Sequence, residues 1–207
     1  MNKLCFDIGA NIGDWSLANI NRYEKIVAIE ASPLTFQKLQ ENCKHDRIEV
    51  LNYCVCNNGG QDITFYHADE DTLSTLNKEW LTNESSRYCN KKYTEINCKT
   101  ILLDSLIKKY GEPDLIKVDV ESGEYICLSS LTKKVPLLCF EWATETNHIT
   151  FQCLDHLLKL GFTSFYIQWG DEYTFIPSDD EFIPIQHLVL ILQKTTPKVH
   201  WGMIWAK

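Results

Sequence analysis

The first twenty residues contain the feature that most constrains the fold: an apolar run that ends in an acid and leads into a glycine-rich turn. Residues 4–20 read LCFDIGANIGDWSLANI. A short apolar run is typical of a strand buried in a parallel sheet, and Asp14 after the turn favours the start of a helix. In an open α/β sheet such a turn lies at the carboxyl ends of the strands, where ligands bind. The segment therefore predicts a strand, a ligand-binding turn and a helix.

Strand and helix patterns alternate along the following part of the chain. Further strands are predicted at residues 25–30, 48–57, 62–68, 95–103, 113–120 and 135–142. Helices are predicted at residues 32–43, 105–111, 122–131 and 150–161. Ser32 and Pro33 give the first of these helices a capping side chain and a favourable first residue.

The carboxyl-terminal part of the sequence reads as strands. Residues 162–169, 172–177 and 185–194 are predicted to be extended, and the last of these segments is predicted to be buried on both faces. Taken with the alternating part, this order predicts one α/β domain over residues 1–207. Its sheet is expected to be mostly parallel, with antiparallel strands near the carboxyl terminus.

The composition disfavours several classes of partner. The chain of 207 residues has a formal net charge of −8 and no cluster of Lys and Arg, which disfavours nucleic acid and anionic membranes. Its nine cysteines lack the spacing of a disulfide framework or a zinc site, so most are expected to be buried thiols. No signal-peptide pattern or membrane-spanning apolar run is present. The sequence therefore predicts a cytoplasmic protein without membrane insertion.

The opening turn discriminates between two kinds of cofactor. A dinucleotide site requires G-x-G-x-x-G, but the corresponding positions here are Gly9, Asn11 and Asp14. Asp7 and Asp14 would also repel a pyrophosphate. A cofactor with an ammonium group and no phosphate, such as S-adenosylmethionine, suits these acids better. Glu30, at the end of the second predicted strand, is placed to accept hydrogen bonds from both ribose hydroxyls of such a cofactor.

Five blocks of the sequence resemble the FkbM-type methyltransferases in order and spacing. They read FDIGANIGDWS, VAIEASPLTFQKLQEN, TILLDSLI, DLIKVDVESGE and VPLLCFEW. The resemblance runs from about Leu4 to Phe165 and implies a Rossmann-like three-layer sandwich that uses S-adenosylmethionine (S-adenosyl-L-methionine) as methyl donor. The family usually carries Asp-Val-Glu-Gly, whereas residues 119–124 read Asp-Val-Glu-Ser-Gly-Glu. The glycine is displaced by one position, so a different local turn is expected.

The resemblance also assigns cofactor-binding residues. The residues expected along the methionine part of the cofactor are Asp7, Gly9, Ala10, Asn11 and Gly13. Glu30 is expected at the ribose, and the residues expected near the adenine are Ala31, Ser32, Cys56 and Asn57. The polar stretch at residues 69–92 is predicted to form a lid over the site, with Ser74 and Thr75 as contacts.

Methyl transfer to a hydroxyl is helped by a general base, because the hydroxyl must lose its proton. Asp119 ends a predicted strand at the cofactor edge and is the first candidate, and Glu121 and Glu141 approach the same edge. His148, on the loop after the next strand, is a further candidate, although a solvated loop histidine is the favoured explanation for it. Converging carboxylates could instead bind a divalent cation that lowers the pKa of the hydroxyl. The sequence leaves base and metal open.

The acceptor expected from the resemblance is a sugar hydroxyl of a glycan or glycoside, for example a deoxyhexose such as rhamnose. Trp80, Trp142 and Trp169 could cover the apolar face of a sugar ring. The chain is also expected to be a module that is fused to, or works with, glycosyltransferases. The alternatives are a methyltransferase for a non-sugar small molecule and a non-catalytic module that binds S-adenosylmethionine. An N-methyltransferase is disfavoured because no Asn/Asp-Pro-Pro-aromatic motif follows residue 118.

Overall fold

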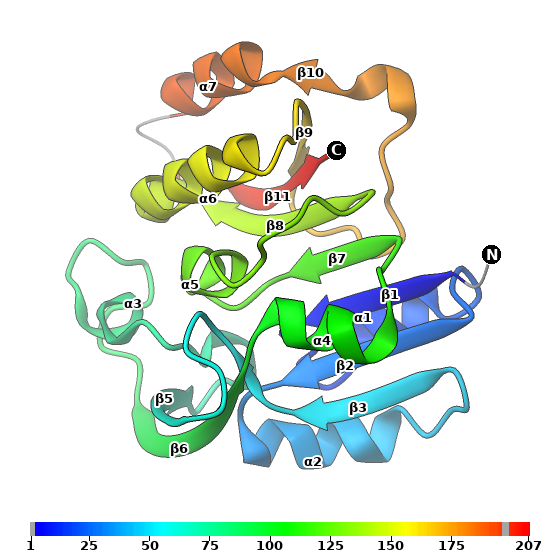
Figure 1. The fold of residues 1–207 in the computed structure, drawn as a ribbon. Helices are drawn as coiled ribbons and strands as arrows, with labels where there is room; N and C mark the ends of the chain where they lie inside the picture. The colour runs from blue at the N-terminus through cyan, green and yellow to red at the C-terminus, as the bar shows by residue number, and fades with distance from the viewer. Residues whose placement is uncertain (1–2, 196–198) are drawn as a thin grey trace.

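The fold is built on a central sheet, seen in a computed structural model that describes residues 3–195 and 199–207. The strands of this sheet are β1 (Leu4–Ile8), β2 (Lys25–Glu30), β3 (Ile48–Asn52), β7 (Leu115–Val118), β8 (Leu138–Ala143), β9 (Ser164–Trp169), β10 (Ile183–Pro184) and β11 (Trp201–Ala206). Their order across the sheet is β10-β9-β11-β8-β7-β1-β2-β3 (Figure 1).

The central sheet is parallel in its first half and antiparallel towards the carboxyl terminus. β1 pairs in parallel with β2 on one side and with β7 on the other, and β7 pairs in parallel with β8. β11 lies antiparallel between β8 and β9, and β10 extends the edge antiparallel to β9. The predicted sheet is thus confirmed. The register places Asp7 of β1 directly opposite Lys117 of β7.

Helices cover both faces of the sheet. The helices on one face are α4 (Leu103–Tyr110), α5 (Glu124–Leu128), α6 (Asn147–Lys159) and α7 (Ile185–Lys194). The helices on the other face are α1 (Asp14–Asn19) and α2 (Pro33–Asn42). Strand alternation divides the core accordingly, because Phe6 packs with the first set and its neighbour Cys5 with the second. The result is the expected Rossmann-like three-layer sandwich (Figure 1).

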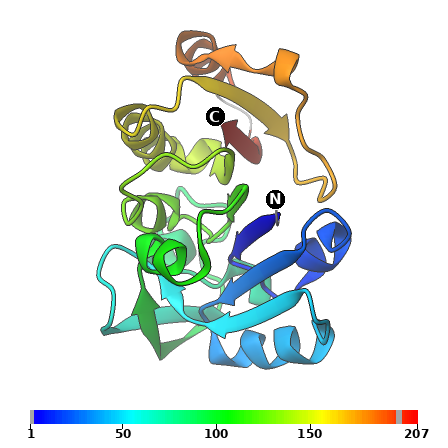
Figure 2. The same cartoon turned by 45° about the vertical axis from the view of Figure 1, so that its right-hand side comes forward.

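A small second sheet lies beyond the carboxyl ends of the central strands. It consists of β4 (Cys54–Val55), β6 (Tyr93–Ile101) and β5 (Asp62–Ala68), in that order, and β5 pairs antiparallel with β6. The chain between β5 and β6 contains the 3-10 turn η1 (Asp71–Leu73) and the helix α3 (Lys78–Thr82). Both cartoon views place this unit beside the carboxyl ends of β1 and β2 (Figures 1 and 2). It forms one wall of the site described below.

The carboxyl-terminal elements differ from the prediction. Residues 185–194 form the helix α7, in which Leu188 and Leu192 are buried one turn apart while Leu190 is 51% exposed. An apolar run of this length fits either a buried strand or a helix, and here the helical spacing applies. Residues 172–177 form no strand, and the 3-10 turn η3 (Asp179–Glu181) follows them; another, η2 (Thr144–Thr146), precedes α6. The strand that completes the sheet is β11, which the sequence reasoning missed.

Two further expectations concern cysteines and membranes. All nine cysteines are free, and eight of them are buried. Among the helices of the described residues, none is long and apolar enough to cross a bilayer.

A substitution at Gly9 tests how closely the chain after β1 approaches the end of β7. Its φ is +76°, and a Cβ at this position would overlap the carbonyl oxygen of Asp119. We expect Gly9→Ala to lower the free energy of unfolding by about 3–5 kcal/mol, through backbone strain and overpacking together. The matched control is Gly60→Ala, where φ is +79° and no atom lies within 4 Å, with an expected loss of about 1 kcal/mol. Urea unfolding measures both; equal losses would contradict the close packing.

Candidate functional site

A cavity lies at the carboxyl ends of β1, β2, β7 and β8, where the small second sheet closes over them. Its volume is about 350 Å³, within the usual range of small-molecule sites. The β1–α1 turn and the end of β2 form one side of it. The segment after β7 and Glu141 of β8 form the other side, and residues 71–76 cover it. The site is therefore where the parallel-sheet topology predicts it.

The β1–α1 turn lines the cavity with Gly9, Ala10 and Asn11. Asn11 adopts a positive φ of 48°, and its backbone N–H donates a hydrogen bond to Glu30 Oε2 at 3.0 Å. Gly13, the next glycine, does not line the cavity; a Cβ there would overlap the Cys43 sulfur of the segment after α2. Gly13 thus lies outside the cavity lining, contrary to the prediction, and it allows α1 to pack closely against the segment after α2.

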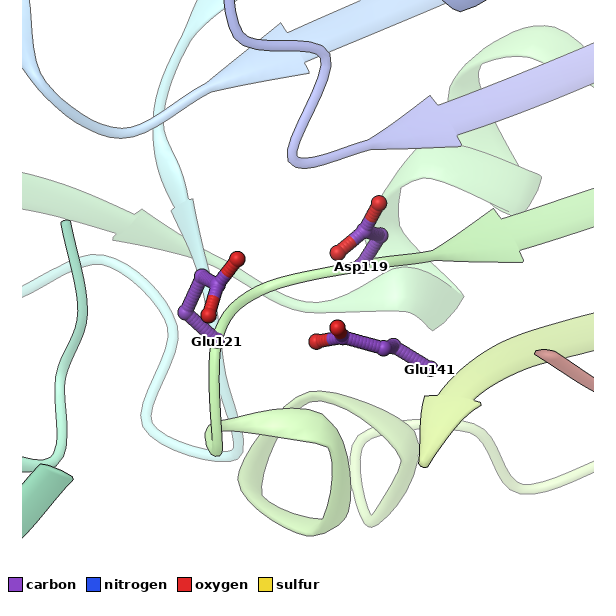
Figure 3. Close-up of side chains that lie close together, drawn as sticks. All are labelled: Asp119, Glu121 and Glu141. Carbon is purple, nitrogen blue, oxygen red and sulfur yellow. The ribbon is translucent and has the colours of Figure 1, made fainter. Parts of the chain in front are cut away.

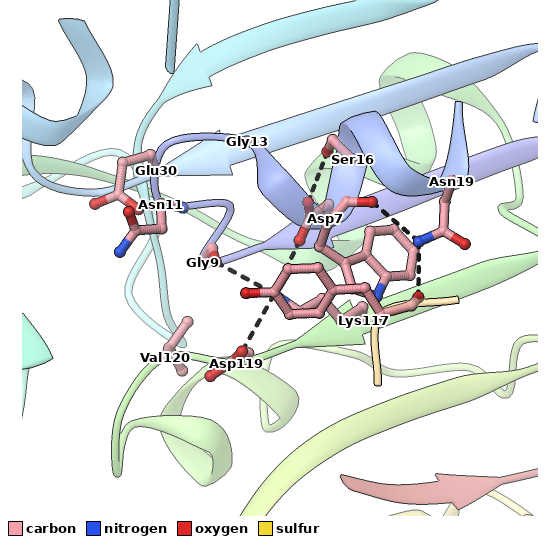
Figure 4. Close-up of polar contacts among 12 residues, drawn as sticks. Asp7, Gly9, Asn11, Gly13, Ser16, Asn19, Glu30, Lys117, Asp119 and Val120 are labelled. Carbon is pink, nitrogen blue, oxygen red and sulfur yellow. Dashed lines mark hydrogen bonds and ion pairs between the residues drawn. The ribbon is translucent and has the colours of Figure 1, made fainter. Parts of the chain in front are cut away.

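Glu30 ends β2 and faces the cavity as predicted. Its Oε1 accepts the backbone N–H of Ser32 at 2.9 Å, and Oε2 accepts that of Asn11. Figure 4 shows Glu30 beside Asn11. Burial raises the pKa of Glu30 to about 7 although these hydrogen bonds oppose the shift. Each oxygen keeps a lone pair for a further donor. Glu30 can therefore accept hydrogen bonds from a pair of adjacent hydroxyls.

Asp7 does not reach the cavity, which corrects its predicted role. Its side chain is 0% exposed and points beneath the turn, where Ser16 Oγ donates to Oδ2 at 2.6 Å. Lys117 Nζ lies 3.1 Å from Oδ1 and 3.3 Å from Asp119 Oδ2 (Figure 4). Burial opposes the charge on Lys117, but the two carboxylates outweigh it and raise the pKa of the ammonium. Asp7 is thus paired within the protein.

The cavity wall that includes Ala31 differs from the prediction. Ala31 lines the cavity, but Ser32 caps α2, and Cys56 and Asn57 lie outside the lining. The side chains that take their place are Tyr53, Cys54 and Val55. The predicted strand ran to residue 57, whereas β4 ends at Val55, so the residues at the strand end come two positions earlier.

The predicted lid segment contacts both the cavity and the turn after β7. Ser74 lines the cavity, whereas Thr75 does not. Thr75 Oγ1 donates instead to the carbonyl oxygen of Glu121 at 2.5 Å, and Asn77 Nδ2 donates to Ser122 Oγ at 2.8 Å. Thr75 therefore holds the segment against the turn and is a support for the site.

Three carboxylates converge on the far side of the cavity. One oxygen from each of Asp119, Glu121 and Glu141 lies within 4.8 Å of the others (Figure 3). Glu121 and Ser122 adopt positive φ values of 51° and 71°, which is the altered turn expected from the displaced glycine. This turn brings Glu121 towards Glu141 of β8. A divalent cation could be held at such a spacing, as could a substrate proton.

The carboxylates differ in their partners. Glu121 Oε2 accepts Trp80 Nε1–H at 3.0 Å, and Glu124 Oε1 accepts the backbone N–H of Val120 at 3.2 Å. In the part of the chain that the structure describes, no donor forms a hydrogen bond to the side-chain carboxylate of Glu141. Burial, followed by the charges of Glu121 and Asp119, raises the pKa of Glu141. Glu141 is therefore the carboxylate of this group that is best prepared to take a proton.

The remaining residues predicted for the site differ in their exposure to solvent. His148 is exposed at the start of α6 and does not line the cavity, so it is not part of the site. Trp80 and Trp142 are buried, and Trp169 is half exposed and packs edge-on against Trp142. The exposed aromatic rings that line the cavity are those of Tyr173 and Trp201. Trp201 was missed because it belongs to the unpredicted strand β11.

A comparison with protein families decides the class of this site. The family model described as the methyltransferase FkbM domain matches residues 7–168. The chain belongs to the FkbM methyltransferase family. It is an S-adenosylmethionine-dependent methyltransferase.

Solved structures show the same fold for this FkbM methyltransferase. A precorrin-6y C5,15-methyltransferase from Geobacter metallireducens has 10% identity and a TM-score of 0.50, covering 100% of this chain and 80% of its own. A precorrin 8w decarboxylase from Methanobacterium thermoautotrophicum has 12% identity and a TM-score of 0.51, covering 100% and 82%. At these identities the similarity concerns the fold alone. A search of curated proteins gives no match.

The residues of this FkbM methyltransferase fit S-adenosylmethionine. The Gly9–Asn11 turn admits a ligand closely but no cationic side chain cradles a phosphate there, since Lys117 is paired with Asp7 and Asp119. Glu30 would hold the ribose hydroxyls, and the acids beyond the turn favour the cationic methionine end. When bound, the donor supplies an electrophilic methyl group on a sulfonium.

Glu30 gives the FkbM methyltransferase a measurable pH dependence. Its pKa rises from 4.5 to about 7 on folding, so the native state binds an extra proton between these values. The free energy of unfolding therefore falls as pH rises across this window, by about 3 kcal/mol from this group. We expect Glu30→Gln to reduce the fall between about pH 4.5 and 8 in urea titrations. The exposed control Glu84→Gln should keep the wild-type slope, and an unchanged slope in Glu30→Gln would refute the shift.

Proposed function

We propose that the protein transfers the methyl group of S-adenosylmethionine to a hydroxyl of a neutral sugar in a glycan or glycoside, for example a deoxyhexose such as rhamnose. The observation that carries this proposal is Glu141, a carboxylate at the cavity with a raised pKa and no hydrogen-bond donor in the described residues. A hydroxyl nucleophile requires a proton acceptor of this kind, and burial together with the neighbouring negative charges of Glu121 and Asp119 strengthens the affinity of Glu141 for a proton.

The reaction is an in-line displacement at the methyl carbon. The acceptor oxygen forms the new O–C bond as the S–C bond breaks, and its proton passes to Glu141. The products are a methyl ether and S-adenosylhomocysteine. Much of the acceleration comes from holding the two reactants in line within the closed cavity. Asp119 is the second choice for the base, because its Oδ2 is already paired with Lys117 Nζ at 3.3 Å.

The lining of the cavity supports a neutral acceptor. Of the lining residues that the structure describes, the cationic ones are Arg87 and Lys117. Arg87 Nε lies 3.4 Å from Glu145 Oε1, and Lys117 is held between two aspartates, so the positive charge of each is already offset by carboxylates of the protein. The rings of Tyr173 and Trp201 offer apolar faces to a sugar ring, and the carboxylates accept hydrogen bonds from its hydroxyls. A carboxylated or phosphorylated acceptor would be repelled.

One alternative mechanism keeps the same acceptor. The three clustered carboxylates could hold a divalent cation that lowers the pKa of the hydroxyl in place of a base. A non-sugar alcohol as acceptor and a non-catalytic module that binds the donor are the two alternative functions. The experiment below separates these cases.

The test combines labelled S-adenosylmethionine with a panel of neutral and anionic glycosides, with and without EDTA. We expect methylation of a neutral glycoside, unaffected by EDTA, with the new methyl on oxygen by NMR. Glu141→Gln should lower kcat by about 10²–10³-fold while the affinity for the donor stays nearly unchanged. The matched control is Glu124→Gln, a neighbouring buried acid outside the cavity lining, which should keep wild-type turnover.

Each other outcome selects an alternative. Wild-type turnover in Glu141→Gln would remove Glu141 as the base. Loss of activity in EDTA with recovery on adding Mg²⁺ would favour the cation. Donor binding without turnover over the whole glycoside panel would contradict the sugar acceptor, and turnover with a non-sugar alcohol would then identify the other class.

A further inference from the structure

We propose that Asp119, and not Asp7, binds the ammonium group of the donor's methionine part, and that Lys117 is the positioning residue that holds Asp119 in place for this role. The inference depends on S-adenosylmethionine as donor and is independent of the acceptor proposed above. It departs from the expectation drawn from the sequence, in which Asp7 attracts the cation. The reason lies in a buried group of charges beneath the β1–α1 turn.

Lys117 contacts three oxygens from two strand ends. Its side chain is almost fully buried, and Nζ lies 3.1 Å from Asp7 Oδ1 and 3.3 Å from Asp119 Oδ2. Nζ also donates to the carbonyl oxygen of Gly9 at 3.3 Å (Figure 4). An ammonium has three N–H donors, so the contacts match its full capacity. Lys117 therefore has no donor left for a ligand and acts through the groups that it holds.

The two carboxylates that share Lys117 differ in their access to the cavity. Asp7 is fully buried and also accepts Ser16 Oγ–H, whereas the Asp119 side chain is 28% exposed and lines the cavity. A cationic ligand can therefore contact this group only at Asp119. Asp119 Oδ2 faces Lys117, which leaves Oδ1 for the ligand.

The backbone places Asp119 next to the turn that receives the donor. The backbone of Gly9 lies so close to the Asp119 carbonyl that a Cβ would not fit between them. The same turn continues through Asn11 to the Glu30 carboxylate at the proposed ribose position. The turn thus lies between a ribose position at Glu30 and an ammonium position at Asp119, and Lys117 fixes the ammonium position.

A purely structural role for Lys117 makes a different prediction. If Lys117 serves only to neutralise buried Asp7, the double change Asp7→Asn with Lys117→Met removes both charges and should leave donor binding intact. If Lys117 positions Asp119, the same folded double variant should lose affinity for any ligand that carries the methionine ammonium. Asp7→Asn alone keeps the contact between Lys117 and Asp119 and is the matched control.

Three ligands separate the ammonium from the rest of the donor. S-adenosylmethionine carries the ammonium and the sulfonium, S-adenosylhomocysteine carries the ammonium alone, and methylthioadenosine carries neither. Calorimetry without acceptor measures the dissociation constants, and circular dichroism confirms that each variant is folded. We expect Asp119→Asn and the double variant to bind the first two ligands at least about tenfold more weakly, with unchanged affinity for methylthioadenosine. Asp7→Asn should bind all three like the wild type.

Several results would overturn the inference. A folded Asp7→Asn variant that loses affinity as Asp119→Asn does would show that Asp7 itself serves the ligand. Equal losses for methylthioadenosine would show a general disturbance of the cavity. Should the double variant not fold, the comparison of Asp7→Asn with Asp119→Asn still decides. Absence of donor binding by the wild type would overturn the cofactor as well, whereas failure of the glycoside panel alone would leave this inference standing.

Discussion

The buried ammonium of Lys117 is the interaction on which the centre of the molecule depends. It joins β1 and β7 below the ligand cavity by contacting Asp7, Asp119 and the Gly9 carbonyl. Removing one partner from such a group leaves an uncompensated buried charge, which is strongly destabilising. The absence of a Cβ at Gly9 lets the two strand ends approach closely enough for these contacts. The fold and the polarity of the site are therefore set by the same few atoms.

The cavity combines an acidic interior with aromatic walls, and this combination limits its ligands. Its acids favour a cationic donor, and its cationic side chains are paired with carboxylates of the protein. The carboxylates also divide the work, because Glu30 faces the turn, Asp119 is held by Lys117, and Glu141 is free of donors in the described residues. Environment rather than residue type thus separates their proposed roles in ribose binding, ammonium binding and proton transfer.

Local signals in the sequence predicted much of the fold and part of the site. Ser32 accepts the Thr35 N–H and Pro33 begins α2, as their capping chemistry implies, and Glu30 ends β2 at the cavity. The role of Asp7 was not predictable from the motif, since it depends on the register that places Lys117 opposite. The cavity residues predicted at the end of β4 lie two positions too far along the sequence, because strand ends lack a sharp sequence signal. The run at 185–194 carried no strand-specific pattern, so α7 was misread.

We expect the donor to lie across the β1–α1 turn, with its ribose at Glu30, its ammonium at Asp119 and its sulfur towards Glu141. A crystal structure with bound S-adenosylhomocysteine would show all three positions together. We expect both ribose hydroxyls on the Glu30 carboxylate, the ammonium within hydrogen-bond distance of Asp119, and the sulfur facing the open space beside Glu141. A ribose bound away from Glu30, or a sulfur directed away from Glu141, would contradict this arrangement.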